Sequence, residues 1–154
     1  MDSDTKAGLT LAAFLPYRLS VLSNTISGAI AARYDAAFGI SIRQWRVMAV
    51  LGEGEALTAT EIVARTAMDK VAVSRAVADL ETRELIARAA STRDARQSVL
   101  SLTGQGRDIY AEIAPMALDY EREVLAALSQ AELETLTRLL DRLAGAASPD
   151  RPLW

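Results

Sequence analysis

The sequence lacks both histidine and cysteine among its 154 residues. Without cysteine, disulfides, thiolate metal sites and thiol redox sensing are excluded. Without histidine, the usual general base and the commonest metal ligand are missing, which excludes histidine-based triads, zinc sites and haem–histidine ligation. Paired acids such as Glu121 and Glu123 point to different faces of a predicted helix, so they form no acid–base couple. We therefore expect no enzyme, no catalytic residue, no metal and no cofactor.

Long apolar runs are absent too. The longest stretch without a charge, residues 19–32, has 14 residues and includes several Ser, Thr and Asn side chains, whereas a membrane span needs ~20 mostly apolar residues. At the N-terminus Asp2 and Asp4 outnumber Lys6, where a signal peptide has a basic region. We expect a cytoplasmic protein that makes no membrane contact.

Net charge is only −3, but it is unevenly distributed. Residues 61–107 carry eight basic and six acidic side chains, and residues 108–154 carry four basic and nine acidic ones. A basic middle followed by an acidic end suggests that the middle faces a polyanion. Because the excess in the middle is small, the pattern is equally compatible with an ordinary solvated surface.

Hydrophobic residues make up 51% of the chain, and their spacing predicts long helices at both ends. The first covers residues 9–37, with Pro16 in its first turn and Gly39 as a left-handed cap. A helix over residues 104–128 is expected to kink at Pro115, and a last helix opens with a capping box at Ser129 and ends at Gly145 and Pro149. The apolar positions recur every three or four residues, at Leu15, Leu19, Leu22, Ile26 and Ile30 in the first helix and at Leu133, Leu136, Leu139, Leu140 and Leu143 in the last.

The middle of the chain predicts a small winged unit. Capping boxes begin at Ser41 and Thr58, and Asp69 is an N-cap for a helix from Lys70 to about Arg83. Two short strands, residues 85–89 and 99–102, flank a polar loop at 91–96 and form a hairpin. Two short helices, a tight connection and a hairpin are the layout of a winged helix-turn-helix. The predicted fold class is mainly α with a small β-hairpin wing.

The terminal helices have apolar faces too broad for so small a unit to cover. Such faces need a partner, so we expect a homodimer. The corresponding division is a dimerisation helix in residues 1–40, the winged unit in residues 41–103 and further dimerisation helices in residues 104–154.

Several residues of the middle segment resemble the signature of MarR-type transcriptional regulators. Asp94-Ala95-Arg96, followed by Leu102-Thr103 and Gly106, is similar to the family's wing motif, and the resemblance covers roughly residues 10–145. Two positions depart from the pattern. Ala95 stands where a second Arg is common, and Glu84 stands where Gly usually ends the recognition helix, which predicts a different turn geometry there. Further matches are Leu85-Ile86, Ser74-Arg75 and Leu80-Glu81.

This resemblance implies a helical dimer with two winged domains. Members of the family usually repress transcription from palindromic operators and release the DNA when they bind a small, often phenolic, ligand. Short runs near Tyr17, Trp45 and Asp69 are also similar to regulators of aromatic-acid catabolism, some of which respond to aromatic acyl-CoA thioesters. The implied partners are therefore an inverted-repeat duplex, a phenolic acid or aromatic acyl-CoA, and a second copy of the chain.

Candidate DNA contacts lie on the second short helix, on the helix before it and on the wing. Small and basic side chains near a helix start can approach base edges, and a loop Arg can enter the minor groove. Asp94 is expected to pair with Arg96 and orient the loop. The alternatives are a plain solvated face, a weak surface ion pair, and simple capping by Thr58. The predicted residues are Thr58, Thr60, Lys70, Ala72, Ser74, Arg75, Arg93, Asp94 and Arg96.

Effector candidates are basic, polar and aromatic residues of three helices. An Arg suits a carboxylate or phosphate, and an aromatic side chain can stack on a ring. The alternative is that Trp45 is core and Arg46 part of an interhelical ion pair. A second function also stays open, a winged-helix adaptor that binds a protein instead of DNA. The candidates are Arg18, Asn24, Ser27, Trp45, Arg46 and Tyr110.

Overall fold

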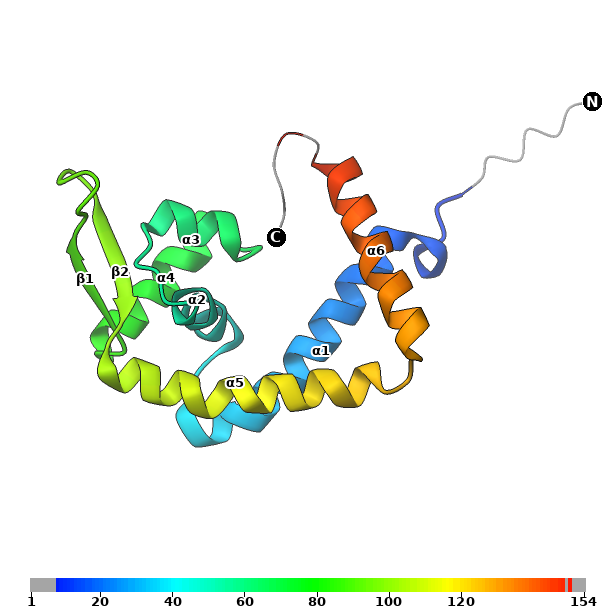
Figure 1. The fold of residues 1–154 in the computed structure, drawn as a ribbon, viewed down its shortest axis with the longest axis horizontal. Coiled ribbons are helices and arrows are strands. Elements are labelled where there is room, and N and C mark those ends of the chain that lie inside the picture. The colour runs from blue at the N-terminus through cyan, green and yellow to red at the C-terminus, as the bar shows by residue number, and fades with distance from the viewer. Residues whose placement is uncertain (1–7, 149, 151–154) are drawn as a thin grey trace, which may run out of the picture.

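A computed structural model of the chain describes residues 8–148 and residue 150, and it has the predicted mainly helical fold with a β-hairpin wing (Figure 1). The short η1 helix spans Leu11–Ala13. The other elements are α1 (Leu15–Phe38), α2 (Ile42–Gly52), α3 (Ala59–Arg65), α4 (Lys70–Thr82), β1 (Ile86–Ala90), β2 (Ser98–Leu102), α5 (Gly104–Leu125) and α6 (Gln130–Ala147).

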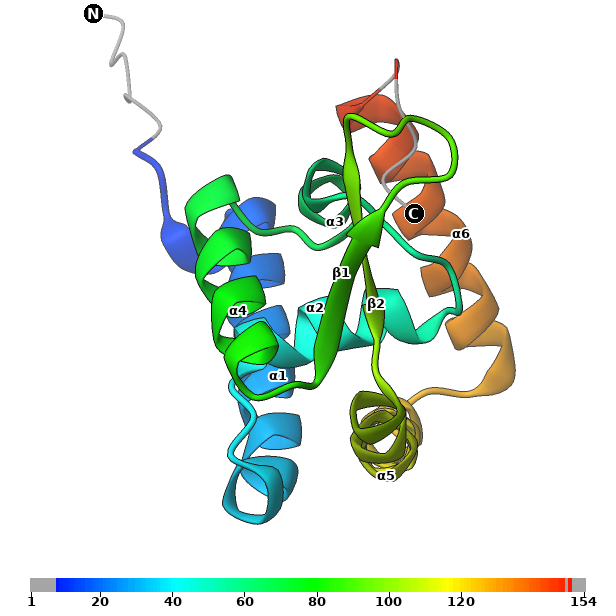
Figure 2. The same ribbon diagram turned by 90° about the vertical axis from the view of Figure 1, so that its left-hand side faces the viewer.

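The winged unit consists of α2, α3, α4 and the hairpin. Strands β1 and β2 pair antiparallel, with Ile86 opposite Leu102 and Ala90 opposite Ser98. Leu57, in the segment between α2 and α3, exchanges two backbone hydrogen bonds with Leu100, at 3.0 and 2.7 Å. Figure 2 shows the hairpin standing beside α4 and in front of α2. The hairpin is thereby tied to the helices at its base, while its loop extends away from them.

One hydrophobic core holds the winged unit together and extends into the neighbouring helices. The inward positions predicted for α4, Val73, Val77 and Leu80, are all buried, as the spacing of four and three residues requires. Tyr34 from α1 and Ile113 from α5 join the same core. The division into segments 1–40, 41–103 and 104–154 remains a prediction. The other buried members are Ile40, Val47, Met48, Leu51, Leu57, Ile62, Ala76, Leu85, Ile86, Leu100 and Leu102.

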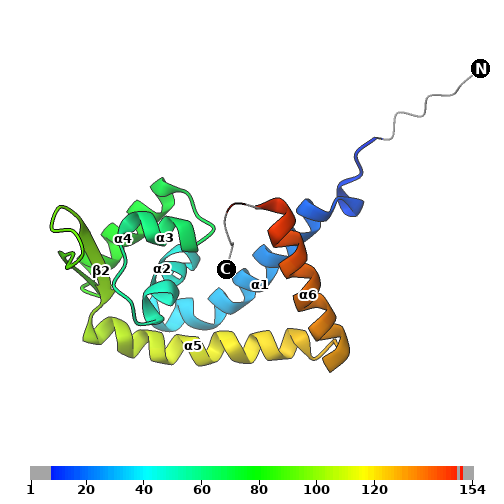
Figure 3. The same cartoon turned by 45° about the horizontal axis from the view of Figure 1, so that its top comes forward.

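Beyond the winged unit, α1, α5 and α6 form an arm. Helix α5 runs from the wing to the far end of the molecule, and α6 turns back towards α1 (Figures 1 and 3). Arg33 of α1 is held by α5, because its guanidinium pairs with Glu123 at 2.6 Å and lies 4.7 Å from the centre of the Tyr120 ring. Helix α6 contains no buried residue. The arm therefore has apolar surface that its own chain does not cover.

Most predicted helix ends are confirmed, because they depend on local hydrogen bonds. The capping boxes at Ser41, Thr58 and Ser129 are complete, and the side chain of Asp69 accepts the N–H of Ala72. Gly39 has the predicted left-handed conformation, with φ +59°.

Three predicted helix limits were wrong. Helix α1 begins at Leu15 and not at residue 9, because Pro16 occupies its first turn. Helix α5 ends at Leu125 and not at residue 128, and it continues through Pro115. Helix α6 passes Gly145 and ends at Ala147. The predicted stop at Pro149 and the tail to Trp154 lie outside the described residues.

The turn after α4 contradicts the expectation of an altered geometry at Glu84. Glu84 has φ +56°, the left-handed conformation that Gly usually supplies. Its N–H bonds the carbonyl of Glu81, and the N–H of Leu85 bonds the carbonyl of Leu80, each at 3.0 Å. This is a complete Schellman motif, with buried Leu80 and Leu85 as its hydrophobic pair. The turn therefore has the conformation that a Gly would supply, with a strained Glu in that place.

Within the described part of the chain, no helix combines the length and the apolar character that crossing a membrane requires.

Candidate nucleic-acid interface and effector pocket

Helix α4 presents most of the predicted DNA contacts on one exposed face. Its start is held by the Asp69 side chain, which accepts the N–H of Ala72 at 2.7 Å. Lys70, Ser74 and Arg75 are exposed, as predicted. Ala72 is half-buried at the edge of this face, so its predicted contact remains a prediction. Among the described residues, Lys70 and Arg75 have no hydrogen-bond or ion-pair partner, so their charges are available to a polyanion.

Sequence reasoning missed two residues beside this face. Val71 follows Lys70 and is 60% exposed. Arg43, at the start of α2, lines a groove of about 280 Å³ together with Val71 and Arg75. Val71 lies three residues before Ser74 and four before Arg75, so it shares their helix face and could have been found from this spacing. No local signal could have found Arg43, because only the packing of α2 against α4 brings it there.

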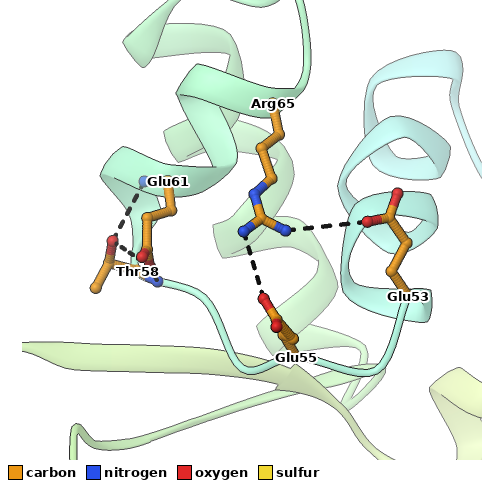
Figure 4. A network of polar contacts seen from close by, with 5 residues as sticks. All are labelled: Glu53, Glu55, Thr58, Glu61 and Arg65. Carbon is orange, nitrogen blue, oxygen red and sulfur yellow. Dashed lines mark hydrogen bonds and ion pairs between the residues drawn. The ribbon is translucent and has the colours of Figure 1, made fainter. Parts of the chain in front are cut away.

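At the start of α3 the hydroxyl of Thr58 is used within the protein (Figure 4). It accepts the N–H of Glu61 at 3.2 Å and lies 3.0 Å from the Glu61 carboxylate. The hydrogen bonds from Thr58 lower the pKa of Glu61, and the positive charge of Arg93 lowers it further. Capping therefore accounts for Thr58. Thr60 is exposed in the first turn of α3 and stays a candidate.

The segment before α3 is fixed by Arg65. Its guanidinium reaches Glu55 at 3.4 Å and Glu53 at 3.9 Å, so it bridges the end of α3 to the connection from α2 (Figure 4). All three side chains are solvent-accessible, so the bridge adds little stability. Its effect is to neutralise Arg65, which leaves this cation less able to bind an anion.

The wing loop is ordered by short polar bonds. The hydroxyl of Ser91 accepts the N–H groups of Arg93 and Asp94, at 3.1 and 3.3 Å. Asp94 pairs with Arg96 as expected and orders the loop, but it does not bond the Arg96 guanidinium. Asp94 instead accepts the backbone N–H of Arg96 at 3.0 Å, because a carboxylate reaches the N–H two residues on in a tight turn. Both arginine head groups are exposed and form no hydrogen bond or ion pair within the described chain, and Arg93 has only a longer-range attraction to Glu61.

Arg88 fixes the wing relative to α4. Its guanidinium donates two hydrogen bonds to the Glu81 carboxylate, at 2.9 and 3.0 Å, and one to the Ser98 hydroxyl at 2.9 Å. Glu81 lies on α4, while Arg88 and Ser98 lie on opposite strands. The two elements that carry the candidate contacts are thus held in one arrangement.

The predicted effector residues separate into two groups. The ring of Trp45 stacks on Tyr110 with centroids 5.7 Å apart and tilts against Tyr34 at 5.9 Å. Trp45 and Arg46 line a cavity of about 790 Å³ between α2 and α3. Tyr110 supports it from behind the Trp45 ring. The remaining lining residues are Ala49, Val50, Val63, Ala64, Arg65, Thr66, Ala67 and Met68.

Three other effector candidates do not line this cavity. Arg18 and Asn24 are exposed on α1, and Ser27 is half-buried there. The alternative of an interhelical ion pair at Arg46 is not seen, and its guanidinium has no acidic partner among the described residues. The described residues also contain no cluster of three metal-ligating side chains.

Comparison with known proteins supports this interpretation of the fold. The model of the MarR family matches residues 38–97. A probable transcriptional regulator from Pseudomonas aeruginosa is 31% identical, with a TM-score of 0.71 over 87% of this chain and 99% of that one. A MarR/EmrR family regulator from Acinetobacter sp. ADP1 is 26% identical, with a TM-score of 0.83 over 92% and 99%. An uncharacterised HTH-type transcriptional regulator of Bacillus subtilis, YdgJ, is 24% identical over 90% of this chain and 85% of its own.

Two more distant structures share the fold and have ligands in their descriptions. CouR from Rhodococcus jostii RHA1, bound to p-coumaroyl-CoA, is 18% identical, with a TM-score of 0.73 over 94% of this chain and 99% of that one. BpsR of Bordetella bronchiseptica, regulated by 6-hydroxynicotinic acid, is 20% identical, with a TM-score of 0.76 over 88% and 96%. With its winged helix-turn-helix, the Lys70 and Arg75 side chains exposed on α4 and these relatives, the chain belongs to the MarR family of DNA-binding transcriptional regulators and is not an enzyme.

Proposed function

We propose that the protein is a homodimeric repressor that binds an inverted-repeat operator and leaves it when a small aromatic acid or its CoA thioester binds. One observation carries the DNA-binding mode. Helix α4 exposes Lys70 and Arg75 without protein partners, and the wing exposes Arg96 in the same way and Arg93 with no hydrogen bond or ion pair to its guanidinium, only a longer-range attraction to Glu61. Unpaired cations on a recognition helix and on a wing suit base edges in one groove and phosphates or the minor groove beside it.

A second copy of the chain is the proposed cover for the apolar arm. Leu15, Leu19 and Leu22 of α1 are exposed. So are Leu136, Leu139 and Leu143 of α6, a helix that buries none of its residues. A two-fold dimer presents its recognition helices symmetrically, so half-site centres should lie about 10 bp apart. Truncation after Leu128 should yield an aggregated or unfolded product in light scattering, and a stable monodisperse monomer would contradict this interface.

The cavity beside Trp45 is the proposed effector site. Its volume of about 790 Å³ lies within the range of small-molecule pockets. Apolar walls from Val50, Val63 and Met68 suit a ring, while the unpaired Arg46 suits a carboxylate or phosphate. The ligands named for BpsR and CouR, an aromatic acid and an aromatic acyl-CoA, have this chemistry. Because α2 packs on both α4 and α5, a ligand here can shift α4 relative to the arm.

Gel shifts on the protein's own upstream DNA test the proposal, with and without aromatic acids and their CoA thioesters. We expect salt-dependent binding to an inverted repeat that one class of ligand abolishes. The same ligand should quench tryptophan fluorescence in the wild type but not in Trp45→Phe, while Trp154→Phe keeps the quenching. Quenching lost only in Trp154→Phe would place the ligand elsewhere. Binding that shows no preference for palindromic DNA would favour the protein-binding adaptor instead.

Two arginine variants separate base reading from backbone contact. Arg75→Ala should cost ~1–3 kcal/mol of operator binding and relax specificity at one position per half-site. Arg96→Ala should weaken operator and random DNA similarly and reduce the salt dependence by about one unit per wing. Titrations on operator and scrambled duplex at several salt concentrations measure both effects. A change of sequence preference in Arg96→Ala alone would show that the reading helix was assigned wrongly.

A further inference from the structure

The exposed face of α4 carries an apolar side chain that the fold does not explain. Val71 is 60% exposed, and within residues 40–103, all of which are described, it is the only large hydrophobic residue with an exposed side chain. The other exposed large hydrophobic residues lie on the N-terminal segment, α1, α5, α6 and the α5–α6 connection. Isolated exposed valines are common on protein surfaces, so the position of Val71 has to carry the argument.

That position is the N-terminal end of the helix face proposed to enter the major groove. Three other exposed residues lie three, four and seven positions after Val71, namely Ser74, Arg75 and Ala78. This helical spacing places all four side chains in one strip along α4. Val71 lies in the first turn of α4, immediately after the Asp69 cap and Lys70. In helix-turn-helix proteins the first residues of the recognition helix contact base edges. A side chain here meets a base in preference to a phosphate.

The surroundings of Val71 identify the kind of surface that it meets. Arg43 and Arg75 line the same groove of about 280 Å³ as Val71, together with Asp69 and Asp79, and Lys70 precedes Val71. Both carboxylates accept hydrogen bonds within the protein, Asp69 from the Ala72 N–H at 2.7 Å and Asp79 from the Gln44 amide at 3.4 Å, whereas the three cations have no such partner among the described residues. A protein surface that covered an apolar side chain would also have to neutralise these three cations, which duplex DNA does by itself. On the major-groove edge of a base pair, the apolar group available to a valine is the 5-methyl group of thymine.

We propose that Val71 reads the 5-methyl group of a thymine in each operator half-site. This inference rests on the proposed DNA-binding mode. Val71 and Arg75 are four residues apart, a rise of about 6 Å along the helix, and stacked base pairs are about 3.4 Å apart. The required thymine therefore lies within about two base pairs of the base that Arg75 contacts. A valine cannot donate or accept a hydrogen bond, so it discriminates at this position only through the methyl group.

Replacement of thymine by uracil tests the methyl contact directly, because it removes the methyl group and leaves base pairing intact. A preferred site is first selected from a random duplex pool with the full-length protein. Each dT of that site is then replaced by dU in turn, and affinity is measured by fluorescence anisotropy. We expect one position per half-site at which dU weakens wild-type binding about fourfold, equivalent to the ~0.8 kcal/mol of one buried CH₂ group. Val71→Ser should bind dT and dU equally at that position.

Val21→Ser is the matched control, since Val21 is an exposed valine of α1, far from α4 in the chain. Its ratio of dT to dU affinity should equal that of the wild type, whatever its overall affinity. A selected site with no dU-sensitive thymine, or a sensitivity that persists in Val71→Ser, would overturn the inference and leave the proposed DNA binding intact. Failure to select any site would overturn the DNA-binding proposal itself.

Discussion

Glu84 is the position at which a single substitution should make this protein more stable. It occupies the left-handed position after α4 with φ +56° and is exposed. A residue other than Gly pays roughly 1–2 kcal/mol in this conformation. Its carboxylate also lies at the C-terminal end of a helix, where negative charge is unfavourable by about 0.3–1 kcal/mol. Both effects disappear in Glu84→Gly.

One opposing effect reduces the gain. Gly has more conformational freedom in the unfolded chain, which costs about 0.4–1 kcal/mol. No interaction of the folded state is lost, because the hydrogen bond that Glu84 accepts from the Thr103 hydroxyl, at 2.7 Å, goes to its backbone carbonyl. We therefore expect Glu84→Gly to raise the free energy of unfolding by about 1 kcal/mol, which raises Tm by roughly 2–4 °C in a chain of this size.

Two further variants separate backbone strain from charge. Glu84→Gln removes the charge and keeps the side chain, whereas Glu84→Ala removes the charge but retains the left-handed strain. Urea unfolding at one fixed protein concentration measures all three, because dimer stability depends on concentration. Glu84→Gly should exceed both controls. If it were no more stable than Glu84→Ala, strain at this residue would play no part and the reasoning would be refuted.

Three other predictions concern stability. Gly106→Ala should lower the free energy of unfolding by ~1–3 kcal/mol or more, because a Cβ there would lie 1.9 Å from the backbone oxygen of Leu85. Gly104→Ala is the control, since a Cβ at Gly104 meets open space, and it should cost far less. Equal losses of stability in urea unfolding would contradict this prediction. Burial raises the pKa of Tyr34 to about 12 from 10.0, so the folded state favours the protonated phenol. The free energy of unfolding should therefore fall between pH 10 and about 12. Tyr34→Phe should reduce this fall when unfolding is measured across that pH range. Arg83 donates to the last carbonyls of the α1 end at 2.7 and 2.8 Å, so Arg83→Gln should cost about 1 kcal/mol; an unchanged urea midpoint would show that this contact is lost in solution.

The helix starts and the wing were predictable because their causes are local. Ser41, Thr58, Asp69 and Ser129 each bond an N–H three residues on, and such bonds depend on sequence spacing alone. The inward face of α4 followed from helical periodicity in the same way. Errors arose where two local rules competed. Asp94 bonds the backbone N–H of Arg96 and not its guanidinium, and Glu84 adopts the left-handed conformation that its turn requires.

The sequence by itself thus determined the element order, the fold class and the family of regulators, since these depend on patterns that neighbouring residues share. The tertiary structure decided which distant side chains meet. It placed Arg43 beside α4, stacked Trp45 on Tyr110, and brought Arg83 to the end of α1. Packing of α2 against α4 and against α5 accounts for the first two of these contacts. Contacts between residues far apart in the chain produce no periodic pattern in the sequence. Only the packing of the folded core therefore decides which of these residues touch.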